Sequence, residues 1–520
     1  MAAPTGFRLR IRIRQEEKRE CSARDCIRPY CKNMIHYYSL GGYNIVLDVA
    51  SGAVHSVDET AYDAICSYGP KGAIETKELL MSKYPLLTDE DVSELFAEIE
   101  QLIRAGKLFS ADSFGFSPAL EREKASKLEA APKLEVEPKR EMAPEREEAL
   151  EREKTPAREA ALKALCLNVS HVCNMSCDYC FAGKGGYGGG PGLMSLETGK
   201  RAVDFLVSSS AGRVNLDIDF FGGEPLLNFG AVKGIVNYAR SIERAAGKRF
   251  RFTLTTNGLL IDEDVIGFAN REMHNVVLSL DGRPETNDAK RKLPGGGGSY
   301  YAVVPKIKRL VEARGGKGYY IRGTFTRDNP DFVNDILHLA DLGFTELSME
   351  PAVAKPGSPH EFKAGDLAGI EKQYELLAYE MLRRKKQGRG FSFYHFSLDL
   401  TGGPCIYKRL AGCGVGAEYL AVTPDGTLYP CHQFVGDGRF VMGDVWRGVV
   451  NEGLRDEFGG CNICTRPECR ECWARLYCSG GCSANAFYAS GAVDGIYEIG
   501  CAMFKKRMEC AIMMKVAGVV

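Results

Sequence analysis

Three cysteines stand within eight residues of one another in the segment CNMSCDYC, which runs from Cys173 to Cys180. The thiolates of Cys173, Cys177 and Cys180 are separated by three and then two residues, so they can converge on one small iron-sulfur cluster. A cubane cluster needs four ligands, and three cysteines on a short loop leave one iron free to bind a small molecule. The Asn, Ser and Asp residues between the thiols indicate a polar loop rather than a buried core.

The alternative is that these thiolates bind a zinc ion, with His171 as the fourth ligand. Compact structural zinc sites normally combine two short ligand pairs separated by a longer loop. The spacing here differs from that pattern and favours a cluster.

The composition indicates a globular chain with about three domains, because the chain has 520 residues and 45% hydrophobic content. A formal net charge of -1 and a pI near 6.7 disfavour nucleic acid as a partner. No stretch has the features of a membrane span or a secretory signal. Nineteen cysteines, mostly in short-spaced groups, indicate metal ligation and a reducing cytoplasm rather than a disulfide framework.

Residues 1–33 form a basic extension that contains Cys21, Cys26 and Cys31 at regular spacing. Met34 then begins a segment typical of a new domain. We expect the extension to be flexible, with a small extra metal site as the alternative.

Residues 34–112 are predicted to form a small sheet with three helices. Apolar and polar residues alternate across a Ser51-Gly52 turn, which predicts a two-stranded hairpin running into a helix at Asp58. Two further helical stretches follow, Lys77 to Tyr84 and one that begins at Thr88 with an N-cap and an acidic first turn.

Residues 113–160 are predicted to be a charged linker, because Glu, Lys, Arg, Ala and Pro dominate and the string ALEREK occurs twice. Its prolines break any continuous helix, so we expect it to let the preceding domain move. A charged protein-binding segment is the alternative.

Residues 161–390 alternate six short apolar runs with helical stretches. The runs are LCLNVS, VNLDIDFFGGEP, FRFTLTTNG, NVVLSLDG, YYIRGTFT and ELSMEPA. This alternation predicts parallel βα units, an α/β fold and a partial (β/α)6 barrel with active residues at the carboxyl ends of the strands. Glycine-rich loops at 183–192 and 294–298 lack the spacing of phosphate loops and are expected to be mobile covers over the barrel mouth.

The cysteine loop with Tyr179 before its last thiol, followed by Gly222-Gly223-Glu224-Pro225 after the second run, resembles radical S-adenosylmethionine (SAM) enzymes. In that family the open iron chelates the methionine end of SAM, and one electron cleaves SAM to a 5'-deoxyadenosyl radical. The resemblance implies SAM contacts at Tyr179, Gly222, Gly223, Glu224, Asn257, Ser279, Asp281 and Arg322. The last four of these residues could instead be ordinary caps at the ends of strands.

Residues 391–520 are rich in cysteine and resemble the SPASM extension of radical SAM peptide maturases, which holds two auxiliary 4Fe-4S clusters. The resemblance implies three 4Fe-4S clusters in all and assigns ligands to each tail cluster. The first set is Cys413, Cys431 and Cys482 with Cys405 as a candidate fourth, and the second set is Cys469, Cys472, Cys478 and Cys501.

Several other cysteines lie outside these sets. Cys461 and Cys464 are surplus and could compete for either cluster, and a zinc ribbon that pairs 461/464 with 469/472 is disfavoured by the short loop between them. Three more, in apolar settings, are expected to be inert core thiols: Cys66, Cys166 and Cys510.

Residues 34–112 resemble the winged-helix-like peptide-recognition domain at the front of enzymes that modify ribosomally made peptides. There a leader peptide adds a strand to an exposed sheet edge. A winged-helix DNA binder has a similar layout, but the acidic helix after Thr88 argues against it.

The segments HYYSLGGYNIVLDVASGAVHSVDE, GGEPLLNF, LAVTPDGTLYPCHQFVG and CWARLYCSGGCSANA together resemble the maturases of six-cysteine (SCIFF) peptides. That family joins a peptide cysteine sulfur to the α-carbon of an acceptor residue through a thioether. The resemblance implies a small cysteine-rich precursor peptide as substrate and an electron donor such as ferredoxin or flavodoxin, with no nucleic-acid or membrane partner.

Two other functions stay open on the sequence. One is another SPASM modifier, which forms carbon-carbon bonds or oxidises a sulfatase cysteine; the front domain disfavours the sulfatase reaction. The other is an iron-sulfur sensing protein without catalysis, which would not explain GGEP after the cysteine loop within a βα repeat.

Overall fold

A computed structural model describes residues 34–112, 161–352, 354, 357–400 and 406–518 of the chain. The predicted extension at 1–33, the predicted linker at 113–160 and Cys405 lie outside the described residues. Within the described part, no helix is both long enough and apolar enough to cross a membrane.

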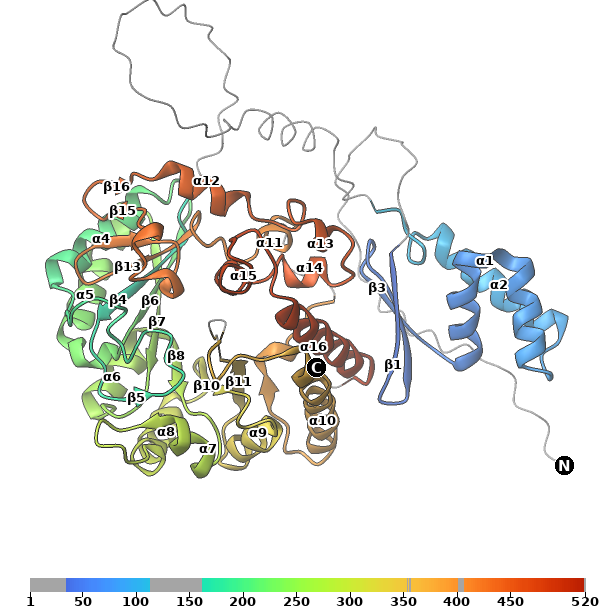
Figure 1. Ribbon diagram of the computed structural model, residues 1–520, viewed down its shortest axis with the longest axis horizontal. Coiled ribbons are helices and arrows are strands. Elements are labelled where there is room, and N and C mark those ends of the chain that lie inside the picture. Colours follow the sequence, from blue (N-terminus) through green and yellow to red (C-terminus); the bar gives the residue numbers. More distant parts are fainter. Residues whose placement is uncertain (1–33, 113–160, 353, 355–356, 401–405, 519–520) are drawn as a thin grey trace, which may run out of the picture.

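Six parallel strands form the centre of the fold, and they are the six apolar runs that the sequence predicted. Figure 1 shows them as a curved sheet with the connecting helices around its outside. This arrangement confirms the α/β class and the partial barrel. In hydrogen-bonded order the strands are β4 (Ala164–Ser170), β6 (Asn215–Gly222), β7 (Arg249–Thr256), β8 (Met273–Ser279), β10 (Tyr319–Phe325) and β11 (Glu346–Pro351).

The helices of this region follow the strands in turn, and two of them begin at a residue whose side chain caps the helix. Ser195 accepts a hydrogen bond from the Thr198 amide at the start of the first, and Asp262 accepts one from the Val265 amide at the start of another. The helices are α4 (Leu196–Ser208), α5 (Phe229–Ala246), α6 (Glu263–Glu272), α7 (Pro284–Lys290), α8 (Tyr300–Arg314), α9 (Phe332–Asp341) and α10 (Leu367–Lys386).

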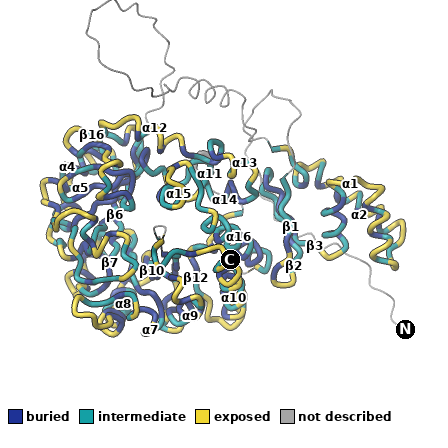
Figure 2. The backbone as a smooth tube through the Cα atoms, viewed as in Figure 1, coloured by how far each residue is buried: buried dark blue, intermediate teal, exposed yellow. Residues whose placement is uncertain are grey.

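The two faces of the large sheet differ in polarity. On β6, Leu216, Ile218 and Phe220 are fully buried, whereas Asp217 between them is partly exposed. Asp217 forms an ion pair with Arg251 of the neighbouring strand, at 2.7 Å. Figure 2 shows buried residues along the sheet and exposed residues on the outer sides of the helices. The concave face therefore carries polar side chains.

The cysteine-rich tail extends this sheet at both edges, which the sequence did not predict. β12 (Ser392–Phe393) pairs in parallel with β11, and β13 (Tyr419–Val422) pairs in parallel with β4. Three antiparallel strands follow β13, so the tail and the barrel share one sheet. They are β14 (Thr427–Tyr429), β15 (Gly443–Asp444) and β16 (Gly448–Val449).

The rest of the tail consists of short helices and one long final helix. The final helix, α16, buries seven side chains between Met503 and Met514 and packs against α10. The tail helices are α11 (Ile406–Ala411), α12 (Glu452–Gly460), α13 (Pro467–Arg470), α14 (Arg475–Cys478), α15 (Ser483–Ser490) and α16 (Glu498–Val516).

The front sheet has three strands: the hairpin predicted across Ser51-Gly52 is present as its second and third strands, and the first strand is an additional one that the sequence did not predict. Its strands are β1 (Ile35–Leu40), β2 (Tyr43–Asp48) and β3 (Ala53–Val57), all antiparallel. Gly41 and Gly42 both have positive φ and make a two-residue turn inside what looked like one apolar run.

Two helices follow the front sheet. In α1 (Glu59–Lys83) the helix breaks at Gly72, whose φ is positive, so its second part covers the separate helix predicted at Lys77. α2 (Asp89–Arg104) begins with the predicted N-cap, because the Thr88 hydroxyl accepts from the Asp91 amide and the Asp91 carboxylate accepts from the Thr88 amide.

The front sheet packs on α16, as Figure 1 shows for β1. His36 stacks on Trp473 with ring centres 3.8 Å apart, and its Nε2 lies 3.0 Å from the Glu509 carboxylate. The Tyr38 hydroxyl donates to the Glu509 carbonyl at 3.1 Å. We expected the linker to let the front domain move. In the structure, however, one face of the front sheet is buried against α16.

Two adjacent residues of β2 test this packing, because they face opposite sides of the front sheet. Leu47 belongs to the main core with α16, and Val46 belongs to the small core with α1 and α2; both are fully buried. We predict that Leu47→Ala lowers the free energy of unfolding by about 2–5 kcal/mol and speeds amide hydrogen exchange in α16. The matched change Val46→Ala should speed exchange in residues 35–104 and leave α16 protected. Equal exchange of α16 in both variants would contradict the shared core.

Candidate functional site

The cysteine loop lies at the carboxyl end of β4, and a short strand fixes its middle. This strand, β5 (Ser176–Cys177), pairs antiparallel with β9 (Arg291–Lys292), so Cys177 lies opposite Arg291. Cys173, Cys177 and Cys180 are all partly buried. The structure therefore places the three thiols where the sequence expected them, at the strand-end edge of the barrel.

The two glycines of GGEP lie directly against the start of this loop. The Gly223 amide donates to the Ser170 carbonyl at 2.7 Å, and the Glu224 amide donates to the Val172 carbonyl at 2.9 Å. A Cβ atom on Gly222 would lie 2.3 Å from the Ser170 oxygen, and one on Gly223 would lie 2.3 Å from the Val172 oxygen. Contact with SAM was the expected reason for these glycines, and the structure adds a contact within the protein that only glycine permits.

Glu224 connects the ends of β6 and β7 and is 1% exposed. Its carboxylate accepts hydrogen bonds from the Thr256 hydroxyl at 2.8 Å, the Asn257 amide at 2.9 Å and the Leu226 amide at 3.1 Å. Burial raises the pKa of Glu224, and these three hydrogen bonds oppose the rise. The side chain is thus held rigidly, and its contact with SAM stays a prediction.

Asn257 continues this network towards the cysteine loop. Its Nδ2 donates to the Asn174 side-chain oxygen at 2.7 Å and lies 3.8 Å from the Cys173 sulfur. The ends of β6 and β7 and the first cysteine therefore form one connected group.

A second group joins Tyr179, Asp281 and Arg291. The Tyr179 hydroxyl donates to Asp281 Oδ2 at 2.6 Å, and Arg291 Nη1 donates to the Tyr179 oxygen at 3.0 Å. The other carboxylate oxygen of Asp281 accepts from the Thr324 amide at 3.0 Å. Sequence reasoning missed Arg291, because it stands in the basic run Lys290-Arg291-Lys292, which resembles a solvated surface.

Ser279 and Arg322 are neighbours in register on β8 and β10. Ser279 is partly buried and Arg322 is exposed. The strand ends thus bring the expected SAM contacts to one edge of the barrel, and their individual roles stay predictions.

Burial raises the pKa of the Cys173 thiol to about 11 and also raises that of Cys177. Because thiolates are the ligands, metal binding at these cysteines releases protons. Thiolates are the donor type of a 4Fe-4S cluster, so the chemistry of these three cysteines fits that group.

The first expected tail set includes three described thiols that lie near one another. Cys431 is buried, while Cys413 and Cys482 are exposed. Burial raises the pKa of Cys431, and the thiols of Cys482 and Cys413 add to the rise. Cys405, the candidate fourth ligand, lies outside the described residues.

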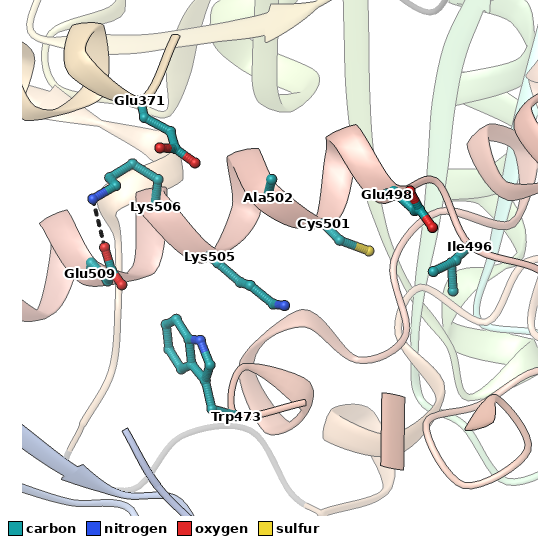
Figure 3. Close-up of a pocket in the computed structure, with 9 residues that line it drawn as sticks. All are labelled: Glu371, Trp473, Ile496, Glu498, Cys501, Ala502, Lys505, Lys506 and Glu509. Carbon is teal, nitrogen blue, oxygen red and sulfur yellow. Dashed lines mark ion pairs between the residues drawn. The ribbon is translucent and has the colours of Figure 1, made fainter. Parts of the chain in front are cut away.

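The second expected set also comes together. Burial raises the pKa of Cys478 to about 12, with further contributions from Cys501, Cys469 and Cys472. Figure 3 shows the Cys501 sulfur beside a pocket of about 420 Å³, which Trp473 and several charged residues of α16 also line. The pocket therefore borders this thiol group rather than the strand-end edge.

Cys461 and Cys464 have different surroundings. The Cys461 thiol donates to the Glu457 carbonyl at 3.2 Å. Burial raises the pKa of Cys464, which Arg475 and Arg470 oppose.

The three expected core thiols differ in exposure. Cys166 and Cys510 are 1% and 0% exposed, as predicted, whereas Cys66 is only partly buried.

Part of the first glycine-rich loop, which was predicted to be a mobile cover, packs closely against its neighbours. A Cβ atom on Gly185 would lie 2.9 Å from Cys173 Cβ, and one on Gly436 would lie 1.8 Å from the Tyr187 carbonyl oxygen. Tyr187 is 5% exposed and donates its hydroxyl to the Gly222 carbonyl at 3.2 Å. The loop therefore joins the cysteine loop, β6 and the tail.

Comparisons with known proteins match the region of the chain that contains this site. Residues 167–340 match the Radical SAM superfamily. An uncharacterized protein of Methanocaldococcus jannaschii is 32% identical over 135 residues, which make up 26% of this chain and 44% of that protein, less than half its length. The cysteine-type anaerobic sulfatase-maturating enzyme of Clostridium perfringens is 25% identical over 351 residues, covering 62% of this chain and 88% of the enzyme.

Two further relatives extend the comparison. The radical SAM cyclopropyl synthase TigE of Paramaledivibacter caminithermalis is 22% identical over 346 residues, covering 62% of this chain and 68% of the synthase. The solved structure of native anSMEcpe with bound AdoMet has a TM-score of 0.57 at 22% identity and covers 69% of this chain and 100% of its own. The chain thus has the α/β radical SAM fold, and a radical SAM cyclopropyl synthase and a cysteine-type anaerobic sulfatase-maturating enzyme are among its relatives.

Proposed function

We propose that this protein is a radical SAM maturase, closest to the SCIFF maturases, that installs a thioether between a cysteine sulfur and an α-carbon of a ribosomally made, cysteine-rich peptide. Its parts would be a peptide-recognition domain at 34–112, a linker at 113–160, a barrel at 161–390 and a SPASM domain at 391–520. It would work in the cytoplasm with a ferredoxin- or flavodoxin-type electron donor.

The observation that carries the proposal is the convergence at the strand ends. Three thiols with no fourth protein ligand on their loop lie next to the networks of Glu224 and Asp281. Such a site suits a cluster that binds SAM through its open iron. When bound, the cluster and SAM supply one-electron cleavage of SAM and removal of a hydrogen atom from the peptide.

The protein's own residues would bind and orient the reactants. Asn257, Ser279, Asp281 and Arg322 would hold SAM against the cysteine loop, together with the GGEP backbone. The concave face of the sheet, with its Asp217–Arg251 ion pair, offers polar partners to an extended peptide.

The tail thiols would complete the electron balance. Loss of the α-hydrogen atom and of the thiol proton leaves one surplus electron when the carbon-sulfur bond forms. The sets around Cys431 and Cys478 would hold two auxiliary 4Fe-4S clusters that receive this electron.

Oxidation of a sulfatase cysteine is a second candidate, because a cysteine-type sulfatase-maturating enzyme is among the relatives. The front sheet favours a leader-guided peptide instead, because it offers strand edges for β-addition. The two functions differ in product, since one forms a crosslink and the other an aldehyde.

We predict about twelve irons per chain after anaerobic reconstitution, which corresponds to three cubes. Replacing Cys173, Cys177 and Cys180 by Ala should remove about one third of the iron and all SAM cleavage, because only this set binds SAM. Iron analysis and a 5'-deoxyadenosine assay measure the two effects. Cys66→Ala is the control and should keep the full iron content. Full SAM cleavage by the triple variant would refute the radical SAM site.

We predict that the leader of the substrate peptide adds to β1 or β3, the two edge strands of the front sheet. Amide hydrogen exchange should then slow in one edge strand when the leader is present. β2 is the internal control, because its backbone is already paired on both sides. An unchanged exchange rate throughout residues 35–57 at saturating leader would exclude strand addition there.

We predict a peptide product lighter by two hydrogens, with a cysteine sulfur bonded to an α-carbon. With a substrate deuterated at the acceptor α-carbon, deuterium should appear in 5'-deoxyadenosine, and the crosslinked cysteine should resist alkylation after disulfide reduction. Mass spectrometry follows both. A mass loss that dithiothreitol reverses would indicate a disulfide, and deuterium transfer only from a β-carbon label would indicate a different SPASM reaction.

A further inference from the structure

Arg291 is a buried cation that contacts the cysteine loop at several points. It begins β9, lies opposite Cys177 in the β5–β9 pair and is 7% exposed. Its Nη1 donates to the Tyr179 oxygen at 3.0 Å, and its Nη2 lies 3.9 Å from the Met175 sulfur. One guanidinium therefore touches the residues on both sides of Cys177.

Two buried carboxylates lie near Arg291, those of Asp281 and Glu224. Its Nη1 lies 4.0 Å from Asp281 Oδ1, at the outer limit of an ion pair. Its Nε is covered by protein atoms and has no hydrogen-bond acceptor among the described residues. The contacts of Arg291 that bear on the cysteine loop are therefore those of Nη1 and Nη2.

The flanking lysines of the same basic run differ from Arg291. Lys292 is partly buried and pairs with the exposed Asp178 at 3.1 Å. Lys290 is also partly buried and pairs with Asp328. Of the three residues only Arg291 is buried, and Lys292, whose side chain is the more exposed of the two lysines, is the matched residue for comparison.

We propose that Arg291 is a positioning residue for the SAM-binding cluster: its guanidinium holds Tyr179 and β5 in place, and its positive charge makes the cluster easier to reduce. The inference rests on the proposed function. Reduction adds negative charge to the cluster, so a nearby buried cation stabilises the reduced form. Hydrogen bonds and charges around a metal centre are known to tune its potential in this way.

The experiment measures the midpoint potential of this cluster by EPR-monitored titration without SAM. It uses full-length, anaerobically reconstituted protein in which the tail cysteines are intact. The variants are Arg291→Gln, Arg291→Lys, Asp281→Asn and, as control, Lys292→Gln. Iron content is measured for each, so that loss of a cluster is distinguished from a change in its potential.

Loss of the Arg291 charge and loss of the Asp281 charge should shift the midpoint potential of the cluster in opposite directions. Arg291→Gln should shift the potential to more negative values and slow SAM cleavage by about 10- to 100-fold at a fixed reductant potential. Arg291→Lys, which keeps the charge, should recover part of the shift. Asp281→Asn should shift the potential to more positive values, and Lys292→Gln should match the wild type.

An Arg291→Gln cluster with the wild-type potential would overturn the inference. If that variant fails to retain its cluster, the midpoint potential of the Asp281→Asn variant tests the inference instead. A shift of that potential to more positive values supports the inference, and an unchanged potential overturns it. If wild-type protein showed no SAM-dependent change in its EPR spectrum, the proposed function itself would fail, which is a different outcome.

Discussion

The close backbone contact between the GGEP loop and the start of the cysteine loop is the constraint on which the site depends. Gly222 and Gly223 lie so near the Ser170 and Val172 carbonyls that any side chain there would overlap them. Two amide hydrogen bonds then fix the cysteine loop to β6. Glu224 follows at once, and its carboxylate carries the same restraint to β7. The cysteines are thus positioned by backbone, which leaves their thiols for ligation.

Much of the fold could be predicted because its signals are local. Six apolar runs separated by helical stretches marked the six parallel strands, and Thr88 marked the start of α2. The first front strand was missed because Gly41-Gly42 interrupts a run that otherwise alternates as one strand. The packing of the front sheet on α16 was also missed. Consecutive residues of β2 are buried, which indicates that both faces of this strand are covered. The pattern does not identify the element that covers the second face.

The site shows the same difference between features that depend on a short stretch of sequence and features that depend on contacts between distant segments. The thiol spacing and GGEP are short patterns, so sequence could locate them. The position of Arg291 depends on the pairing of β5 with β9, segments more than a hundred residues apart, and its neighbours Lys290 and Lys292 form ion pairs with Asp328 and Asp178. Charge alone could not separate the buried member of this run from its two partly buried neighbours, whereas strand register does so directly.

α16 links the front sheet to the second tail thiol group. Cys501 near its start belongs to that group, and Glu509 contacts His36 and Tyr38 of β1. Eight residues separate the two positions, which is about 12 Å along a helix. Trp473, next to Cys472, also stacks on His36, as part of the region that Figure 3 displays. Because these contacts are made by packed elements, the distance from the front sheet to the barrel is set by α16 and not by the length of residues 113–160. A peptide held on the front sheet would therefore reach the concave face of the barrel from a fixed starting point.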